Sequence, residues 1–296
     1  MFSLRIIHIN IKKFNMKQLK KLVDKNKNGK EIDWKGKKLN NLELAESHKR
    51  LGLKKAYRVK ECGTLLYFKR IDEELKKLFK ANFCKDRLCP MCTWRRSMKI
   101  FGQVSKVMDR ALEDKEYRFL FLTLTVKNCS GEELSSEIDK MFNSLKLLFK
   151  RKEVKKIVIG YFRGLEVTYN DECDTYHPHF HIILMVNKSY FKNKGYYLTQ
   201  KDWTNLWKDC LKVDYTPIVN VKAFKTESKE QTRKSICEVA KYTVKDNDYL
   251  FEDMEMTDNI VAILNNALKG RRLIAFGKKF RKIHKELNLD DAEKEI

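Results

Sequence analysis

The chain has 296 residues, of which 43% are hydrophobic and 11% aromatic, a composition typical of a folded globular protein rather than a disordered one. Lysine and arginine number 63 against 40 aspartate and glutamate residues, which gives a formal net charge of +23. No stretch reaches the roughly 20 apolar residues of a membrane span, so no membrane-embedded function is expected. The cationic surplus predicts an anionic partner, with nucleic acid first and a membrane surface as the alternative.

The first residues lack a sustained apolar core before a small-residue cleavage site, so we expect no secretory signal and a cytoplasmic protein. In a reducing cytoplasm, clustered cysteines bind metal more often than they form disulfides. The chain has eight cysteines. Four of them are scattered and are expected to pack in the interior: Cys129, Cys173, Cys210 and Cys237.

Apolar periodicity, together with runs of β-branched and aromatic residues, predicts the following elements in chain order. A helix over 37–52, ended by Gly52, is followed by the cysteine-rich segment 62–92 and a helix over 95–112. Strands are predicted over 117–126, 157–169, 176–186 and 219–224. Further helices are predicted over 132–149, 198–212, 232–246 and 258–268. This order favours an α+β fold, with helices on one face of an antiparallel sheet.

A cluster of four cysteines precedes the first predicted strand: Cys62, Cys84, Cys89 and Cys92. Only two residues separate the last two, a spacing that lets both thiolates bind one tetrahedral zinc ion. Cys62 and Cys84 would complete a four-thiolate site. That zinc would be structural, because four protein ligands leave no position open for a substrate. Four unrelated buried cysteines are the alternative.

A histidine-rich strand is the sharpest local signal. Three of the six histidines occur in five residues, as His177, His179 and His181. Alternate side chains of a strand share a face, so these three imidazoles point the same way. Neutral imidazoles bind divalent metal ions well, and the pattern predicts a metal site. Solvent-facing histidines on an edge strand are the alternative.

The preceding strand brings a carboxylate to the same face. If the hairpin turns near residues 172–173, Glu166 lies opposite His179. Two imidazoles and one carboxylate leave positions open for a phosphate and water, which suits Mg²⁺ or Mn²⁺ acting on a phosphodiester. A register slip of one residue would turn Glu166 away. His177 is then expected to support the site, or else to be a third histidine ligand.

A tyrosine further along the chain has a glutamate one helical turn before it. Glu238 and Tyr242 are spaced i and i+4, and Lys245 follows Tyr242 at i+3 on the same side. Alone, this pattern is typical of a solvated helix face. Beside a metal site it indicates catalysis, because a tyrosine hydroxyl, with an ordinary pKa near 10, needs a nearby cation to act as a nucleophile. Glu238 is then placed to activate a water.

The segments FLTLT, HPHFH and E-x-x-x-Y-x-x-K, in this order, resemble the motifs of the HUH endonucleases. Within that superfamily they are most similar to the rolling-circle plasmid replication initiators with one catalytic tyrosine. The resemblance extends roughly over 33–290 and includes CKDRLCPMC and RRLIAFG. It implies a five-stranded antiparallel sheet flanked by helices, preceded by an N-terminal helical and zinc-knuckle segment.

The resemblance also implies a role for each motif. Residues 121–125 would form a central strand beneath the site, and His179 and His181 would be the metal-binding pair. Tyr242 would attack the scissile phosphate at the plasmid's double-strand origin, forming a 5′-phosphotyrosine and freeing a 3′-OH primer. Glu238 stands where two-tyrosine relatives carry their second tyrosine, and would let water act in termination.

Three regions are expected: a basic N-terminal region with the zinc knuckle over 1–112, the nicking domain over 113–250, and a basic helical segment over 251–296. The implied partners are origin DNA, a host helicase and a host DNA polymerase in the bacterial cytoplasm, and initiators of this kind can dimerise on DNA. The basic run over 269–285 is either a DNA contact or solvated surface.

Two other functions compete with initiation. A conjugative relaxase or a tyrosine transposase would share the histidine strand, but neither usually carries this cysteine knuckle. A non-catalytic, zinc-dependent DNA-binding repressor would explain the charge and the cysteines but leave HPHFH and Tyr242 without a role. No G-x-x-x-x-G-K-[ST] segment occurs, so a fused helicase is not expected.

Overall fold

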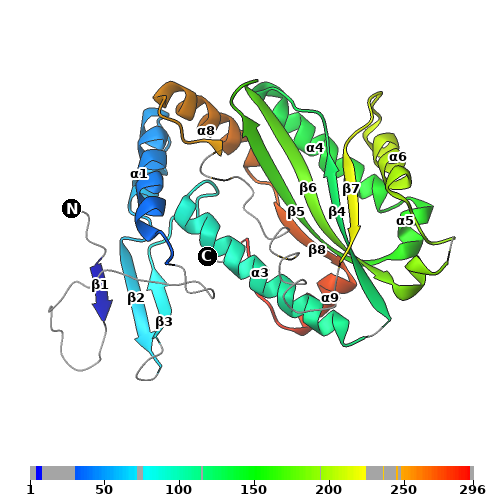
Figure 1. Cartoon of the computed structure of the whole chain (residues 1–296). Helices are drawn as coiled ribbons and strands as arrows, with labels where there is room; N and C mark the ends of the chain where they lie inside the picture. Colours follow the sequence, from blue (N-terminus) through cyan, green and yellow to red (C-terminus); the bar gives the residue numbers. More distant parts are fainter. Residues whose placement is uncertain are drawn as a thin grey trace. The chain divides into compact units, whose positions relative to one another are not determined.

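The computed structural model of the chain describes residues 5–8, 31–71, 76–114, 116–193, 195–224, 236, 245 and 248–293 (Figure 1). The chain divides into two compact units. Unit 1 comprises residues 1–94 and 249–262 with residue 296, and unit 2 comprises residues 95–248 and 263–295. The three-region division expected from the sequence uses other boundaries and stays a prediction. None of the helices that the structure describes is long and apolar enough to cross a membrane.

Unit 1 contains a small sheet and the helices that precede and follow it. Its elements are β1 (Arg5–His8), α1 (Trp34–Arg50), α2 (Ala56–Lys60), β2 (Leu65–Arg70), β3 (Lys76–Ala81), and the first parts of α3 (Pro90–Leu112) and α8 (Met254–Leu268). Strand β2 pairs with β1 in parallel and with β3 in antiparallel orientation. Helix α1 was predicted from the sequence with a start three residues later, whereas β2 and β3 were not predicted.

Helix α1 has clear physical limits. The side chain of Asp33 accepts a hydrogen bond from the backbone N–H of Gly36 at 2.8 Å, which caps the helix. After the last turn, Gly52 has a φ of 67°, a left-handed conformation that stops the helix at little cost. Arg50 forms a bidentate ion pair with Asp258, at 2.6 and 2.8 Å, and so joins α1 to the start of α8.

Unit 2 is built on a five-stranded antiparallel sheet with the order β7-β4-β6-β5-β8, which confirms the predicted fold class. The strands are β4 (Tyr117–Thr125), β5 (Val158–Asn170), β6 (Thr175–Asn187), β7 (Val219–Ala223) and β8 (Ile274–Lys278). The helices are α4 (Gly131–Leu148), α5 (Lys152–Ile157), α6 (Gln200–Leu211), α9 (Lys279–Glu286), the 3₁₀ turn Lys188–Phe191 and the rest of α3 and α8.

Helices cover both faces of this sheet, so the expectation of helices on one face was wrong (Figure 1). On one face Phe142 of α4 packs against Phe180 of β6, with ring centroids 5.1 Å apart. On the other face Phe119 belongs to a buried cluster that includes Val104 of α3 and Phe280 of α9. The continuous apolar run of β6 explains the difference, because a strand buried on both faces shows no alternation.

The C-terminal basic run contains two elements that the sequence pattern did not predict. Ile274–Lys278 forms the fifth strand, β8, which pairs with β5, and α9 follows it directly. The helix predicted over 232–246 lies outside the described residues, apart from Ile236 and Lys245. Ile236 is 1% exposed and belongs to the same buried cluster as Phe119.

Candidate active site and metal centres

Glu166, His179 and His181 come together on one face of the sheet in unit 2. The register pairs Glu166 with His179 across β5 and β6, which confirms the predicted register of the hairpin. One carboxylate oxygen of Glu166 lies 3.2 Å from Nε2 of His179 and 2.8 Å from Nε2 of His181, and the two nitrogens are 3.1 Å apart. Strand alternation alone brings the two histidines to this face, and the tight hairpin brings the carboxylate to them.

These distances suit a bound divalent cation. Adjacent ligands in an octahedral site of about 2.1 Å bond length are about 3.0 Å apart, close to the three separations found here. The three ligand atoms would occupy one side of such a site and leave the other positions to water and substrate oxygens. The histidine side chains are 12% and 13% exposed, so the cluster is largely but not fully shielded from solvent.

Backbone and side-chain contacts orient both imidazoles toward the cluster. Nδ1 of His179 lies 3.1 Å from the carbonyl oxygen of His177, which can only accept, so this nitrogen carries the proton and Nε2 keeps its lone pair. Nδ1 of His181 lies 3.4 Å from the hydroxyl of Thr123 on β4, and its ring stacks on Phe121 with centroids 5.5 Å apart.

The charge on Glu166 is stabilised within the cluster. Its burial opposes ionisation, but the neighbouring imidazoles of His179 and His181 outweigh burial and hold the pKa of the carboxyl well below its usual range. Lys245 adds a cation, with Nζ 3.6 Å from the second carboxylate oxygen of Glu166. Lys245 therefore lies beside the cluster, while its catalytic role stays a prediction. Glu238 and Tyr242 lie outside the described residues.

His177 shares the face of the cluster but does not join it. Its Nδ1 lies 2.9 Å from the side-chain oxygen of Asn128, in the loop between β4 and α4, and the amide of Asn128 in turn donates to Thr175 at 3.0 Å. Burial and the neighbouring His179 lower the pKa of His177. This arrangement favours the supporting role predicted for His177. Sequence reasoning missed Asn128, because nothing local links it to a histidine 49 residues later.

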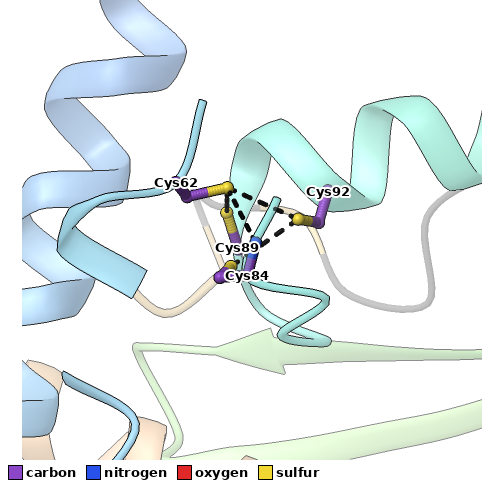
Figure 2. Close-up of side chains that lie close together, drawn as sticks. All are labelled: Cys62, Cys84, Cys89 and Cys92. Atoms are coloured by element: carbon purple, nitrogen blue, oxygen red, sulfur yellow. Dashed lines mark hydrogen bonds between the residues drawn. The ribbon is translucent and has the colours of Figure 1, made fainter. Parts of the chain in front are cut away.

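The four cysteines of the knuckle converge in unit 1, as Figure 2 shows. Cys62 follows α2, Cys84 and Cys89 lie in the loop after β3, and Cys92 is in the first turn of α3. All four are fully buried, at 0% exposure, and none forms a disulfide. Sulfur–sulfur separations are 3.5 Å from Cys62 to Cys92 and 3.6 Å for two further pairs.

A tetrahedral zinc ion fits these positions. With zinc–sulfur bonds of about 2.3 Å, ligand sulfurs are about 3.8 Å apart, close to the observed separations. Three N–H groups also point at the sulfurs, including the backbone N–H of Cys84, 3.4 Å from Sγ of Cys62. Burial raises the pKa of the Cys89 thiol, and a coordinated cation is the usual means of holding such buried sulfurs as thiolates.

Helix α1 supplies an outer layer to the cysteine cluster, which sequence reasoning missed. The amide of Asn41, buried at 0% exposure, donates to Sγ of Cys89 at 3.4 Å and to the carbonyl oxygen of Val59 at 2.8 Å. The ammonium of Lys38 donates to the side-chain oxygen of Asn41 at 2.9 Å and to the carbonyl of Cys62 at 2.9 Å. Burial lowers the pKa of Lys38, and the nearby cysteine sulfurs act in the opposite direction.

The remaining cysteines have mixed environments. Cys129 and Cys210 are buried, as expected. Cys173 is exposed, so the expectation that it packs in the interior was wrong, because it lies in the turn of the β5–β6 hairpin. Cys237 lies outside the described residues.

Comparison with known proteins places the chain among replication proteins. The model of the replication protein family matches residues 75–296. A "Protein rep" of Streptococcus pneumoniae is 43% identical over 280 residues, covering 93% of this chain and 86% of the relative. A "Protein rep" of Bacillus amyloliquefaciens is 44% identical over 296 residues, covering 92% and 87%. One of Lentilactobacillus hilgardii is 44% identical over 276 residues, covering 92% and 88%.

No solved structure matches the chain significantly. The family match covers most of the sequence and includes the histidine strand, the segment with Tyr242 and the last three cysteines of the knuckle. The resemblance to rolling-circle plasmid initiators inferred from the motifs is therefore confirmed, and the chain belongs to the replication protein family.

Proposed function

We propose that this plasmid replication protein nicks one DNA strand at the double-strand origin and remains joined to the 5′ phosphate through Tyr242. The observation that carries the proposal is the cluster of Glu166, His179 and His181, with ligand atoms 2.8 to 3.2 Å apart. A replication protein without nuclease chemistry has no evident need for two imidazoles and a carboxylate at the spacing of a metal site.

The three residues of the cluster would hold Mg²⁺ or Mn²⁺. When bound, such a cation supplies Lewis acidity toward the scissile phosphate. His179 would present its Nε2 lone pair, because its Nδ1 faces the carbonyl of His177. His181 would do the same with its Nδ1 donating to the hydroxyl of Thr123. Glu166 supplies a negative charge that offsets part of the charge of the cation and keeps it in place.

In the proposed nicking step, the hydroxyl oxygen of Tyr242 attacks the phosphorus and the bond to the 3′ oxygen breaks. The phenol proton leaves to solvent or a neighbouring base, and the departing 3′ oxygen takes up a proton from solvent to become the hydroxyl that primes a host polymerase. One phosphodiester replaces another, so little free energy is lost and the strand can be rejoined. Lys245, whose ammonium lies beside Glu166, supplies a cation that favours the phenolate form of a nearby tyrosine.

Termination in this proposal uses Glu238. Its carboxylate would take a proton from a water molecule, whose oxygen would attack the phosphorus of the strand to be cut. The bond to the 3′ oxygen would break, and that oxygen would take up the proton, where two-tyrosine relatives use a second tyrosine as the attacking group. Two described residues, Ile236 before Glu238 and Lys245 after Tyr242, have positions that support these roles. Ile236 lies in the core of unit 2, and Lys245 reaches Glu166. Because Lys245 is three positions after Tyr242, their Cα atoms can be at most about 11 Å apart.

The cysteine cluster would hold a structural zinc ion, since its four sulfurs fill a tetrahedral site completely. Origin DNA is the expected partner, and a host helicase and polymerase would extend the nicked strand. A dimer of the initiator on the origin is a further expectation.

A nicking assay on supercoiled plasmid with its cognate origin tests the proposal. We expect a nick that requires Mn²⁺ or Mg²⁺, and a protein–DNA adduct that survives a denaturing gel. Tyr242→Phe should keep origin binding but lose the adduct, because it lacks the attacking oxygen. Tyr197→Phe, which removes a hydroxyl from a half-exposed tyrosine elsewhere in unit 2, is the control and should form the adduct normally.

Two results would contradict the proposal. An adduct that persists in Tyr242→Phe would remove Tyr242 as the nucleophile. Specific origin binding without a nick, under both metals, would favour the DNA-binding repressor instead.

A further inference from the structure

A basic hollow of about 630 Å³ lies in unit 2, between the C-terminal end of α3, the starts of β4 and β5, and α9. Four basic side chains line it: Arg110, Lys278, Lys279 and Lys282. Two acidic side chains, Asp114 and Glu286, also line it, so the hollow keeps a positive balance. Tyr117 and Ile159 also line it.

The fold holds two of these lysines in defined positions. Lys278 has a φ of 50° and a ψ of −127°, a backbone conformation that glycine normally occupies, and its ammonium donates to the carbonyl oxygen of Val158 at 2.7 Å. The ammonium of Lys279 lies 4.1 Å above the ring of Tyr117 and 3.7 Å from Asp114.

Lys282 differs from Lys278 and Lys279, which also line the hollow. It makes no ion pair with any residue in the part of the chain that the structure describes, and it is exposed. Its charge is therefore available to a ligand. By contrast, two arginines of the same basic run are committed to the fold, since Arg271 pairs with Asp139 at 2.6 Å and Arg272 with Asp291 at 3.1 Å.

The hollow and the Glu166 cluster lie at opposite ends of one face of the sheet. Tyr117, at the start of β4, lines the hollow, and Thr123, six residues later on the same face of that strand, contacts His181. At about 3.3 Å per residue the two places are about 20 Å apart. That length corresponds to about six base pairs of duplex DNA.

We propose that this hollow binds a backbone phosphate of the origin DNA about six base pairs from the scissile phosphate. The inference rests on the proposed nicking function, which defines the position of the scissile phosphate. Basic side chains such as Lys282 bind phosphate oxygens, and a site at a fixed distance would set the register of the DNA without reading its sequence. The net charge of +23 favours DNA over an acidic peptide as the occupant.

The test compares two double variants of α9 that each remove two positive charges. Lys279→Ala with Lys282→Ala removes charges that line the hollow. Arg281→Ala with Lys285→Ala, the matched control, removes exposed charges from the same helix outside it. The single variant Lys282→Ala is added because Lys282 makes no ion pair among the described residues, so its loss should leave the fold intact.

Affinity is measured for origin duplexes lengthened in steps of two base pairs on each side of the mapped nick. With wild-type protein we expect affinity to rise once the duplex on one side of the nick is longer than about six base pairs. The hollow variant should lose that gain, and its plot of log affinity against log salt concentration should become shallower by about two. A neutral methylphosphonate at that position should weaken wild-type binding several-fold and leave the hollow variant unchanged.

An equal loss in the control variant would overturn the proposal, because charge alone would then explain the effect. So would the absence of any position at which a methylphosphonate discriminates wild type from the hollow variant. Failure to nick would contradict the proposed function separately, since the methylphosphonate scan over the bound origin needs no cleavage. Normal cleavage of a short single-stranded oligonucleotide by the hollow variant would show that the nuclease site is intact.

Discussion

Glu166 is the only carboxylate within the three-residue cluster of unit 2, and its replacement tests the metal site most directly. Glu166→Gln keeps the shape of the side chain and an oxygen acceptor but removes the negative charge. We expect the Kd for Mn²⁺, measured by isothermal titration calorimetry, to rise at least about tenfold, as for other altered metal shells. Nicking at limiting Mn²⁺ should fall with it.

Glu172→Gln is the control for this change, because it removes the same charge from an exposed position in the turn of the same hairpin. Its affinity for Mn²⁺ should match that of the wild type. If the two variants bind Mn²⁺ equally well, Glu166 is not a ligand, and His177 becomes the next residue to test.

Lys38 is the charged residue of the outer layer around the cysteine cluster. Lys38→Met removes an ammonium that donates to Asn41 and to the backbone carbonyl of Cys62, while keeping much of the apolar stem. Four thiolates with one zinc ion, as proposed, would carry a net negative charge, so the loss of the Lys38 ammonium should weaken zinc binding. We expect a chelator to remove zinc about tenfold faster, as measured with a coloured zinc indicator.

Lys35→Met, at an exposed position of the same helix, should release zinc at the wild-type rate. Equal acceleration in both variants would mean that general surface charge, rather than the hydrogen bonds of Lys38, sets the rate.

At the scale of an element, β8 depends on a close approach to β5. Gly277 pairs with Tyr161, and a Cβ atom built on Gly277 would lie 2.1 Å from two carbons of the Tyr161 ring. That ring is itself stacked on Phe149, with centroids 4.2 Å apart. Gly277→Ala must displace this stack, so we expect the free energy of unfolding, from urea titration, to fall by about 1–3 kcal/mol.

Gly102 in α3 gives the opposite expectation, because a Cβ built there meets nothing within 4 Å beyond the chain neighbours and backbone of its own helix. Gly102→Ala should raise the free energy of unfolding by about 0.5–1 kcal/mol through the better helix propensity of alanine. If Gly277→Ala instead raises the free energy of unfolding, the backbone of β8 at Gly277 lies farther from the Tyr161 ring than in this structure.

Local patterns predicted some elements of this chain better than others. Strands β4, β5 and β6 were predicted to within two residues at each end, because they are long and rich in β-branched and aromatic residues. Strand β8 was not, because five residues within a lysine-rich run carry no periodicity. Its strand conformation comes from pairing with β5, a segment more than 100 residues away in the sequence.

For the whole molecule, the two units should respond differently to loss of the proposed zinc ion. The cysteine sulfurs join α3 to segments of unit 1 far apart in the sequence, whereas the sheet of unit 2 has its own buried core. We expect a strong chelator to increase amide hydrogen exchange in α1 and α2, while β4, β5 and β6 keep their protection. Hydrogen-exchange mass spectrometry measures both, with Cys89→Ser as a metal-free reference.

Purified protein without bound zinc, or an increase in exchange shared equally by both units, would contradict this expectation. The first result would mean that the four cysteines are only buried thiols. The second would mean that the units unfold as one.

The sequence by itself determined which side chains meet in the two clusters. Alternation along a strand is a local property with a period of two, so HPHFH was enough to bring His179 and His181 to one face. A tight turn fixes which residues of its two strands lie opposite each other, so the pairing of Glu166 with His179 was also predictable. The spacing of Cys89 and Cys92, with two residues between them, is likewise a local feature of the sequence.

Only the tertiary structure decided what surrounds these groups. Lys38 and Asn41 meet the cysteines, and Asn128 meets His177, through packing between segments 20 to 50 residues apart. The basic hollow likewise combines α3 with a helix formed more than 150 residues later. Such contacts depend on how buried faces fit together, and that fit leaves no periodic trace in the sequence.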